Sequence, residues 1–333
     1  MHRWLEMIAA RQPVRRVMLD AGLHVLAGAV DYLPRMRQRM AACELIEDVE
    51  YVRRGDVGLC LDILKPRGDG PHPVLIYLHG GAFAICSKRT HRALAAAYAS
   101  QGYVVCNVDY RLAPTHPYPA SLEDACAAWL WVLDHVGDYG GDTRRIALAG
   151  ESAGANLALA VTLTCCLPRP EAFAAPVYAR GHLPRAALLY CGLLQVSQPE
   201  RHRRAGVSTL AATIVEDAAS SYLGQPARHG TGHPALADPL CLIEAMAGPS
   251  PLPPLFIAAG LNDPVLSDSQ RLEHALERLG SPCQAHYYPG ETHAFHVMFW
   301  REQALRCWRD SFAFLQHHLR LSPAREVPAR QPA

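Results

Sequence analysis

A serine flanked by two glycines, in the run Gly150-Glu151-Ser152-Ala153-Gly154, is the strongest chemical signal in the sequence. It follows the short apolar run Ile146 to Ala149, which predicts a buried strand, and precedes a longer apolar run that predicts a helix. A turn of this kind must be very tight, so small residues are needed on both sides of the serine. The hydroxyl is then presented at a helix N-terminus, where backbone N–H groups favour developing negative charge. Ser152 is therefore predicted to be a nucleophile, although the pentapeptide alone could be a chance turn.

A second glycine-rich turn, His79-Gly80-Gly81-Ala82-Phe83, follows the apolar run Val74 to Leu78. In such a turn the backbone N–H groups can point into a site and bind an oxyanion. Removal of one donor of this kind typically lowers turnover by about 10²–10³, so the turn would matter nearly as much as the nucleophile. Taken alone, it could equally be an ordinary turn at the end of a strand.

A serine hydroxyl needs a general base, and the base needs a carboxylate to orient it. After Ser152, Asp263 and His293 each stand just beyond a predicted strand, in the chain order serine, acid, histidine. Because the carboxyl ends of parallel strands meet at one edge of a sheet, the three side chains are expected to converge. Asp268 and His296 are the nearest alternatives for the acid and the base.

The elements that must position these residues are predicted from apolar periodicity. Eight strands are expected, at residues 49–52, 57–64, 74–78, 103–108, 145–149, 186–190, 255–258 and 285–288. Helical stripes lie between most of them, for example Leu122, Cys126, Trp129 and Leu133 at spacings of four, three and four. Apolar strands alternating with helices indicate a doubly wound α/β sheet.

Two regions depart from this alternation. Residues 1–45 carry a helical pattern, and residues 192–250 contain one plausible helix, Thr209 to Leu223. Together they are expected to form a helical cap over the catalytic domain, residues 46–320, with 192–250 as its insert. The proline-rich end, residues 321–333, is expected to be a disordered tail.

The motifs, taken together, resemble the hormone-sensitive-lipase group of α/β-hydrolases, and within it the bacterial acetyl esterases. The resemblance covers residues 70–320 and rests on five matches in the same order. They are His79 to Phe83, Asp109 to Pro114 with Pro117 to Ala120, Gly150 to Asn156, Asp263 to Asp268 and Tyr288 to Phe295.

The resemblance implies the α/β-hydrolase fold, a mostly parallel eight-stranded sheet flanked by helices and covered by a helical cap. It implies a triad of Ser152, Asp263 and His293. It also implies an oxyanion hole formed by three backbone N–H groups, those of Gly81, Ala82 and Ala153.

The sequence departs from the family pattern at two positions. Ala82 stands where a third glycine is usual, which keeps the N–H but adds a Cβ. Glu151 stands where aspartate is usual, and it is one methylene longer. The glycine-rich turn at residues 79–83 is called the oxyanion loop below. Three further motif residues are expected to order this loop and not to react: His79, Asp109 and Arg111.

Composition limits the partners. The 333 residues carry a net charge of +1 without a long basic tract, so no nucleic-acid partner is expected, and a small-molecule ester is the expected substrate. The apolar stretch Val17 to Leu33 is interrupted by Asp20, His24 and Asp31, so neither a signal peptide nor a membrane partner is expected. The 11 scattered cysteines contain no Cys-x-x-Cys and are expected to be free thiols, as in a cytoplasmic protein.

The expected activity is hydrolysis of short-chain acyl esters through a serine acyl-enzyme, that is, a carboxylesterase with no cofactor and no metal. An amidase or formamidase on the same triad is the nearest enzymatic alternative. A non-catalytic ligand receptor is the alternative from another class, since gibberellin receptors resemble this family but lack the catalytic histidine. His293 favours an enzyme. A homodimer is left open.

Overall fold

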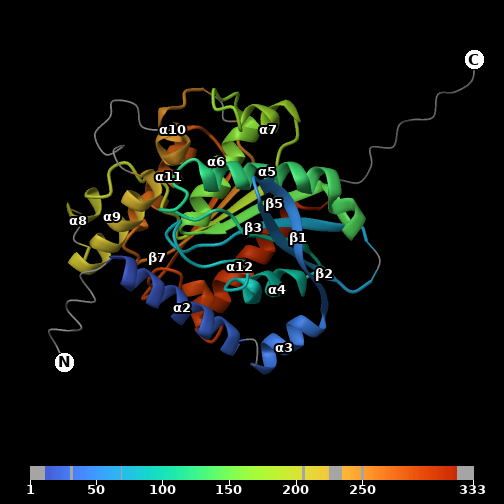
Figure 1. Cartoon of the computed structure of the whole chain (residues 1–333). Coiled ribbons are helices and arrows are strands. Elements are labelled where there is room, and N and C mark those ends of the chain that lie inside the picture. Colours follow the sequence, from blue (N-terminus) through green and yellow to red (C-terminus); the bar gives the residue numbers. More distant parts are fainter. Residues whose placement is uncertain are drawn as a thin grey trace, which may run out of the picture.

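The computed structural model describes residues 12–30, 33–68, 70–204, 207–224, 235–248 and 251–320. A sheet of eight strands forms its centre (Figure 1), in the spatial order β1-β2-β4-β3-β5-β6-β7-β8. The strands are β1 (Cys43–Arg54), β2 (Val57–Pro66), β3 (His72–Leu78), β4 (Val104–Val108), β5 (Gly141–Glu151), β6 (Ala186–Tyr190), β7 (Leu255–Gly260) and β8 (Cys283–Tyr288).

The pairing explains where the catalytic loops lie. β1, β2 and β4 pair antiparallel, whereas β4, β3, β5, β6, β7 and β8 run parallel to one another. All six parallel strands therefore end at the same edge of the sheet, and the loops after them meet there. The predicted sheet is confirmed, and each predicted strand is present. β1 begins at Cys43, six residues before the predicted start, because its first half still pairs with β2.

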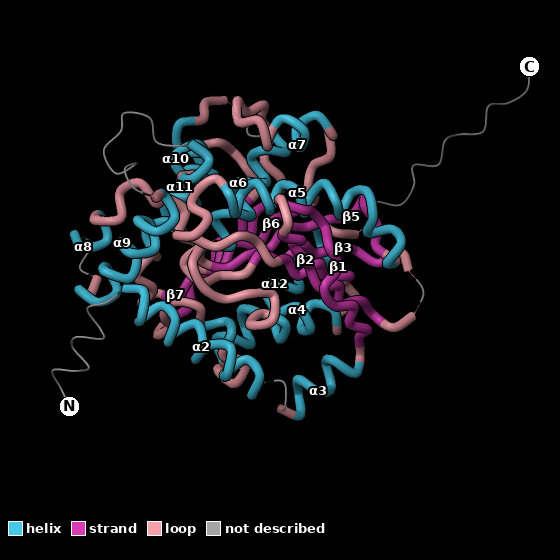
Figure 2. Tube along the Cα trace, in the orientation of Figure 1, coloured by secondary structure: helices cyan, strands magenta, loops and turns pink. Residues whose placement is uncertain are grey.

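Helices cover both faces of the sheet (Figure 2). The longer ones are α2 (Gln12–Val30), α3 (Pro34–Ala41), α4 (Arg92–Ala99), α5 (Ala120–His135), α6 (Ala153–Cys166), α9 (Thr209–Leu223), α11 (Leu266–Arg278) and α12 (Glu302–His318). Shorter ones are α7 (Ala175–Ala179), α8 (Arg201–Arg204) and α10 (Pro239–Ala245), with 3₁₀ turns η1 (Val136–Tyr139), η2 (Ala235–Ala237) and η3 (Phe295–Val297).

The core is divided by the sheet into two apolar clusters. Along β3, Val74, Ile76 and Leu78 face the cluster that contains residues of α5, α6 and α11. Leu75 and Tyr77 face the other cluster, which contains residues of α4 and α12. This alternation is the two-residue period of a strand buried on both faces. Helix α4 was not predicted, because it is alanine-rich and buried on nearly all sides, which leaves no apolar stripe.

Two of the helices in the regions expected to form a cap, α9 and α2, contact the segments at the carboxyl edge, whereas α3 leads into the start of β1 at the opposite edge. α9 has the predicted bounds, and Tyr222 near its end stacks on Phe83 of the glycine-rich turn, with ring centroids 3.7 Å apart. α2 lies against the segment after that turn, where Asp20 accepts a hydrogen bond from the Cys86 N–H at 2.8 Å. The predicted tail lies outside the described residues. In the part of the chain that the structure describes, no helix has both the length and the apolar character that a membrane crossing requires.

Candidate active site

The predicted nucleophile lies in a turn that only small neighbours permit. β5 ends at Glu151 and α6 begins at Ala153, so Ser152 alone joins strand to helix, with φ 52° and ψ −113°. A Cβ at Gly150 would lie 2.2 Å from the carbonyl oxygen of Gly154. A Cβ at Gly154 would lie 2.0 Å from the carbonyl oxygen of Leu78, at the end of β3. The strand-to-helix turn at residues 150–154, here called the elbow, is thus in direct backbone contact with the end of β3, just before the oxyanion loop. This contact holds the strained serine.

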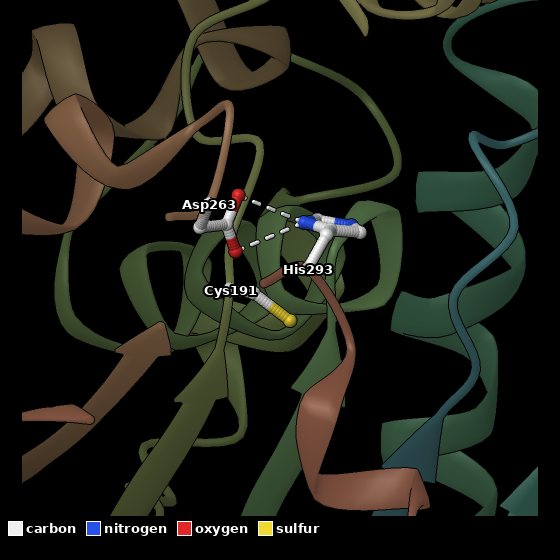
Figure 3. Close-up of side chains that lie close together, drawn as sticks. All are labelled: Cys191, Asp263 and His293. Atoms are coloured by element: carbon white, nitrogen blue, oxygen red, sulfur yellow. Dashed lines mark hydrogen bonds and ion pairs between the residues drawn. The ribbon is translucent and has the colours of Figure 1, made fainter. Parts of the chain in front are cut away.

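The structure brings Ser152, His293 and Asp263 together from the loops after β5, β8 and β7. His293 Nε2 lies 2.9 Å from Ser152 Oγ. On the other side of the ring, His293 Nδ1 lies 3.0 Å from each carboxylate oxygen of Asp263 (Figure 3). Asp263 is 6% exposed, so its charge is screened little by water. This geometry allows the imidazole to take the serine proton while the carboxylate holds the ring in the required tautomer.

The electrostatic surroundings make His293 a stronger base. Burial of the ring alone would lower its pKa, but the charge and hydrogen bond of Asp263 raise that pKa above the ordinary value of 6.5. Glu151 adds to the increase. A histidine base acts in its neutral form, so activity that depends on His293 should be lost as pH falls through this raised pKa.

The predicted oxyanion loop leaves β3 and bends sharply. Gly81, Ala82 and Phe83 all have positive φ, at 111°, 55° and 59°. A Cβ at Gly81 would lie 2.2 Å from the carbonyl oxygen of Ile85, so glycine is required there. Ala153 is the first residue of α6, and the contact of Gly154 with Leu78 keeps the helix start beside this loop. The three predicted donors therefore belong to two segments in contact.

Of the three motif residues expected to order the oxyanion loop, Asp109 and His79 make contacts at that loop or in the segment after it. The Lys88 N–H donates to Asp109 Oδ1 at 2.6 Å, which fixes the segment after the loop. His79 stacks on Tyr110, whose hydroxyl donates to the His79 carbonyl at 2.6 Å. Burial and the neighbouring His91 lower the pKa of His79 to about 3, so its ring is neutral. Arg111 instead pairs with Asp124 at 2.8 Å and ties the loop after β4 to α5.

The two alternatives for acid and base have other partners. Asp268 accepts hydrogen bonds from the N–H groups of Leu194 and Gln195, at 2.9 and 3.1 Å, and pairs with Arg201 at 2.5 Å. It therefore organises the segment after β6. His296 Nε2 lies 3.0 Å from Glu151 Oε2 and does not belong to the contact with Ser152.

The partners of Glu151 could not be predicted from the sequence. It is buried directly before the nucleophile, with His91 3.3 Å from one carboxylate oxygen and His296 3.0 Å from the other. Burial would raise the pKa of Glu151, but the two histidines hold it well below its usual range. The motif gave no sign of these partners, because His91 lies 60 residues earlier in the sequence, in a segment without a motif of its own.

One group of side chains is compact enough to be considered for a metal ion. Among the described residues, ligand atoms of Cys191, Asp263 and His293 lie within 4.8 Å of one another. Figure 3 shows the three side chains close together. Both ring nitrogens of His293 already have partners in the triad. Burial, together with the charge of Asp263, raises the pKa of the Cys191 thiol well above its usual value, so it is a neutral thiol and a poor ligand. The group does not fit a metal centre.

The chain is similar to known α/β-hydrolases. A family model described as the alpha/beta hydrolase fold matches residues 75–297. Carboxylesterase NlhH of Mycobacterium tuberculosis is 32% identical over 225 residues, which are 67% of this chain and 66% of that protein, just under two thirds of its length. An acetyl-hydrolase of Streptomyces hygroscopicus is 33% identical over 256 residues, 75% of this chain and 76% of that protein.

Solved structures resemble the chain over nearly its whole length. A bacterial heroin esterase superposes with a TM-score of 0.76 and 24% identity, over 94% of this chain and 93% of that one. At this identity the likeness shows a shared fold.

Proposed function

The chain belongs to the α/β-hydrolase fold family, and on that basis we propose that it is a carboxylesterase that hydrolyses short-chain acyl esters through a serine acyl-enzyme. The observation that carries the proposal is the continuous contact from Asp263 through His293 to Ser152, at 3.0 and 2.9 Å. Relatives named carboxylesterase and acetyl-hydrolase, each above 30% identity, support the same reaction.

The reaction follows from the geometry. His293 Nε2 takes the proton from Ser152 Oγ as the oxygen attacks the acyl carbon, and the imidazolium that forms is stabilised by Asp263. Backbone N–H groups of Gly81, Ala82 and Ala153 bind the oxyanion of the tetrahedral intermediate. His293 then gives its proton to the leaving alcohol, which departs and leaves the acyl group on Ser152. Water attacks the acyl-enzyme by the same steps and releases the carboxylic acid.

The preference for short acyl chains is supported by the packing beside the oxyanion loop. Phe83 follows Ala82 directly and is fully buried beneath Tyr222, with the rings stacked. Tyr118 meets Tyr222 edge-on, at 5.6 Å between centroids. Three aromatic rings are therefore packed together beside the loop. Each methylene buried in an open apolar pocket would contribute about 0.8 kcal/mol, and we propose that these rings bound the acyl pocket and limit how many methylenes can be buried.

The test is kcat/KM for p-nitrophenyl acetate, butyrate, hexanoate, octanoate and decanoate, measured below their micelle limits beside a p-nitroanilide. We expect a maximum at or before hexanoate, a fall thereafter, and little cleavage of the anilide. A continued rise through decanoate would contradict the short pocket. Faster cleavage of the anilide than of the esters would favour an amidase, and binding without turnover of any substrate would favour a receptor.

A further inference from the structure

We propose that Glu151, His91 and His296 form a positioning network that fixes the oxyanion loop and the base loop against the nucleophile. This inference rests on the proposed ester hydrolysis and adds residues that act through Ser152 and His293. None of the three is proposed to touch substrate.

The first part of the network joins Glu151 to the oxyanion loop. A Cβ at Gly80 would lie 2.6 Å from Glu151 Oε1 and 2.7 Å from Glu151 Cγ, so the side chain lies flat against the loop backbone. His91 Nε2 lies 3.3 Å from the same carboxylate oxygen and 3.4 Å from the backbone nitrogen of Gly80, so the ring stands against both groups. His91 is held in turn by Thr90 Oγ1, 2.8 Å from its Nδ1. The carboxylate and His91 therefore fix Gly80, the residue before the first predicted oxyanion donor.

The second part joins Glu151 to the loop that carries the base. His296 is three residues after His293, in the 3₁₀ turn η3, and its Nε2 lies 3.0 Å from Glu151 Oε2. Its ring stacks on Tyr190 of β6 with centroids 4.6 Å apart, and its carbonyl accepts from Trp308 Nε1 of α12 at 2.9 Å. His296 is 1% exposed, so its position is set by packing on three sides.

The side-chain length at position 151 suits this arrangement. Glu151 uses its two oxygens for two different loops, one through His91 and one through His296. An aspartate is one methylene shorter and could not keep both contacts from the same backbone position. The longer residue is therefore matched to the two histidines, and the three should be considered as one unit.

Charge gives the network a second effect. Glu151 stays ionised beside the triad, and its charge contributes to the raised pKa of His293. Besides Asp263, the other titratable groups that face the network are His79, Tyr77, Cys86, Tyr110, Tyr190 and Cys191. Burial lowers the pKa of His79 and raises the pKa of each tyrosine and cysteine, so these six groups are neutral near pH 7. Loss of the Glu151 charge should therefore lower the pKa of His293.

The experiment compares Glu151→Gln with Glu151→Asp and with a matched control, Asp142→Asn. Asp142 is also a buried carboxylate on β5, but it lies at the opposite end of the strand, where it pairs with Arg144 and Arg145. Each variant is titrated with a p-nitrophenyl phosphonate, so that kcat is expressed per reactive serine. kcat, KM and the pH profile are then measured with p-nitrophenyl butyrate.

For Glu151→Gln we expect kcat to fall by about 10²-fold with little change in KM, because the reacting groups lose alignment. The acidic limb of the pH profile should move to lower pH. Glu151→Asp should keep the limb in place and lose less activity. Asp142→Asn should unfold at lower temperature but keep the wild-type kcat and pH profile.

The proposal is overturned if Glu151→Gln keeps kcat within about twofold and leaves the limb in place. It is also overturned if Asp142→Asn lowers kcat and moves the acidic limb of the pH profile as much as Glu151→Gln does. If Glu151→Gln does not fold, His296→Gln removes one contact and must show the loss of kcat. The rate of phosphonate labelling of Ser152 is measured in parallel. It tests the network even if wild-type protein hydrolyses no ester, an outcome that would overturn the proposed function alone.

Discussion

The catalytic loops and helix α2 are in contact, yet different forces hold them. In the loops, backbone meets backbone: a Cβ at Gly154 would lie 2.0 Å from the Leu78 carbonyl, and one at Gly260 would lie 2.3 Å from the Glu291 carbonyl. α2 instead meets its neighbours through polar side chains. Asp20 accepts from the Cys86 N–H, and His24 Nε2 lies 3.0 Å from Ser87 Oγ.

The two regions also differ in how far their apolar side chains are exposed to solvent. Several apolar side chains of α2 point to solvent; Val17 is 64% exposed and Val25 is 75% exposed. The loops, by contrast, carry buried side chains such as Phe83 and Phe295. The difference indicates that the loops with the candidate catalytic residues are positioned by backbone contacts too close to admit another atom. Helix α2 is instead attached through individual side-chain hydrogen bonds, each of which one substitution can remove. Changes in the loops should therefore affect kcat by orders of magnitude, and changes in α2 should affect binding modestly.

The largest effect is expected at the nucleophile. Ser152→Ala should lower kcat by about 10⁶, because no other group on the elbow can form the acyl-enzyme. The fold should be unchanged by circular dichroism. Ser100→Ala, after α4, serves as the control and should keep full activity. Turnover of the Ser152 variant within about tenfold of wild type would contradict its role as nucleophile.

Asp263 and Asp268, two carboxylates five residues apart, allow an effect on catalysis to be compared with an effect on stability. Asp263→Asn should lower kcat by about 10⁴, because His293 loses the partner that sets its tautomer. Asp268→Asn should mainly lower stability, by about 3–5 kcal/mol, because Arg201 is left without its buried partner. Urea unfolding and kcat measured on both variants separate the two roles. A greater loss of kcat in the folded Asp268 variant would mean that the acid has been misassigned.

Two glycine substitutions compare the regions directly. Gly154→Ala forces a Cβ against the Leu78 carbonyl and should slow phosphonate labelling of Ser152 by about 10²-fold, or prevent folding. Gly22→Ala, on α2, meets no atom within 4 Å and should stabilise the helix by up to about 1 kcal/mol without loss of activity. If both variants behaved alike, the contrast between the regions would be wrong.

The smallest effect is expected where α2 meets the loop. Asp20→Ala removes the acceptor of the Cys86 N–H, which can then be bound by water, because the Asp20 side chain is 38% exposed. KM should rise by about fivefold with kcat nearly unchanged, as expected for the loss of one partly exposed hydrogen bond. Steady-state kinetics on p-nitrophenyl butyrate measure both. A large loss of kcat with KM unchanged would place α2 among the parts that set the chemistry.

Much of the fold and the candidate site could be predicted because the signals are local. A parallel strand buried on both faces is a short apolar run, and Gly150 is required by a contact with Gly154, within the same turn as Ser152. The helix Thr209–Leu223 was predicted with its actual bounds, and its N-cap Ser208 accepts from the Ala211 N–H at 3.3 Å. The order of serine, acid and histidine then predicted which loops meet.

The features that could not be predicted are contacts between side chains that lie far apart in the sequence. In the sequence Asp20 and His24 only interrupt an apolar stretch, but in the structure both contact the segment after the oxyanion loop. In the sequence Glu151 is only a one-methylene departure from the family pattern, but in the structure it contacts residues 60 positions earlier and 145 positions later. No periodicity encodes such contacts, because they arise only after the sheet has brought the loops together.

The attachment of α2 also bears on the order in which the chain folds during synthesis. α2 leaves the ribosome before the described strands, whereas its partners Cys86 and Ser87 lie after β3, in a segment anchored where the Lys88 N–H donates to Asp109, after β4. None of the described side chains of α2 is fully buried, so the helix has little reason to collapse on the sheet earlier. Among the described helices α2 is the first to be made, and we expect it to dock late. Until then its apolar side is open to other chains, and slow pairing of the parallel strands would prolong that exposure.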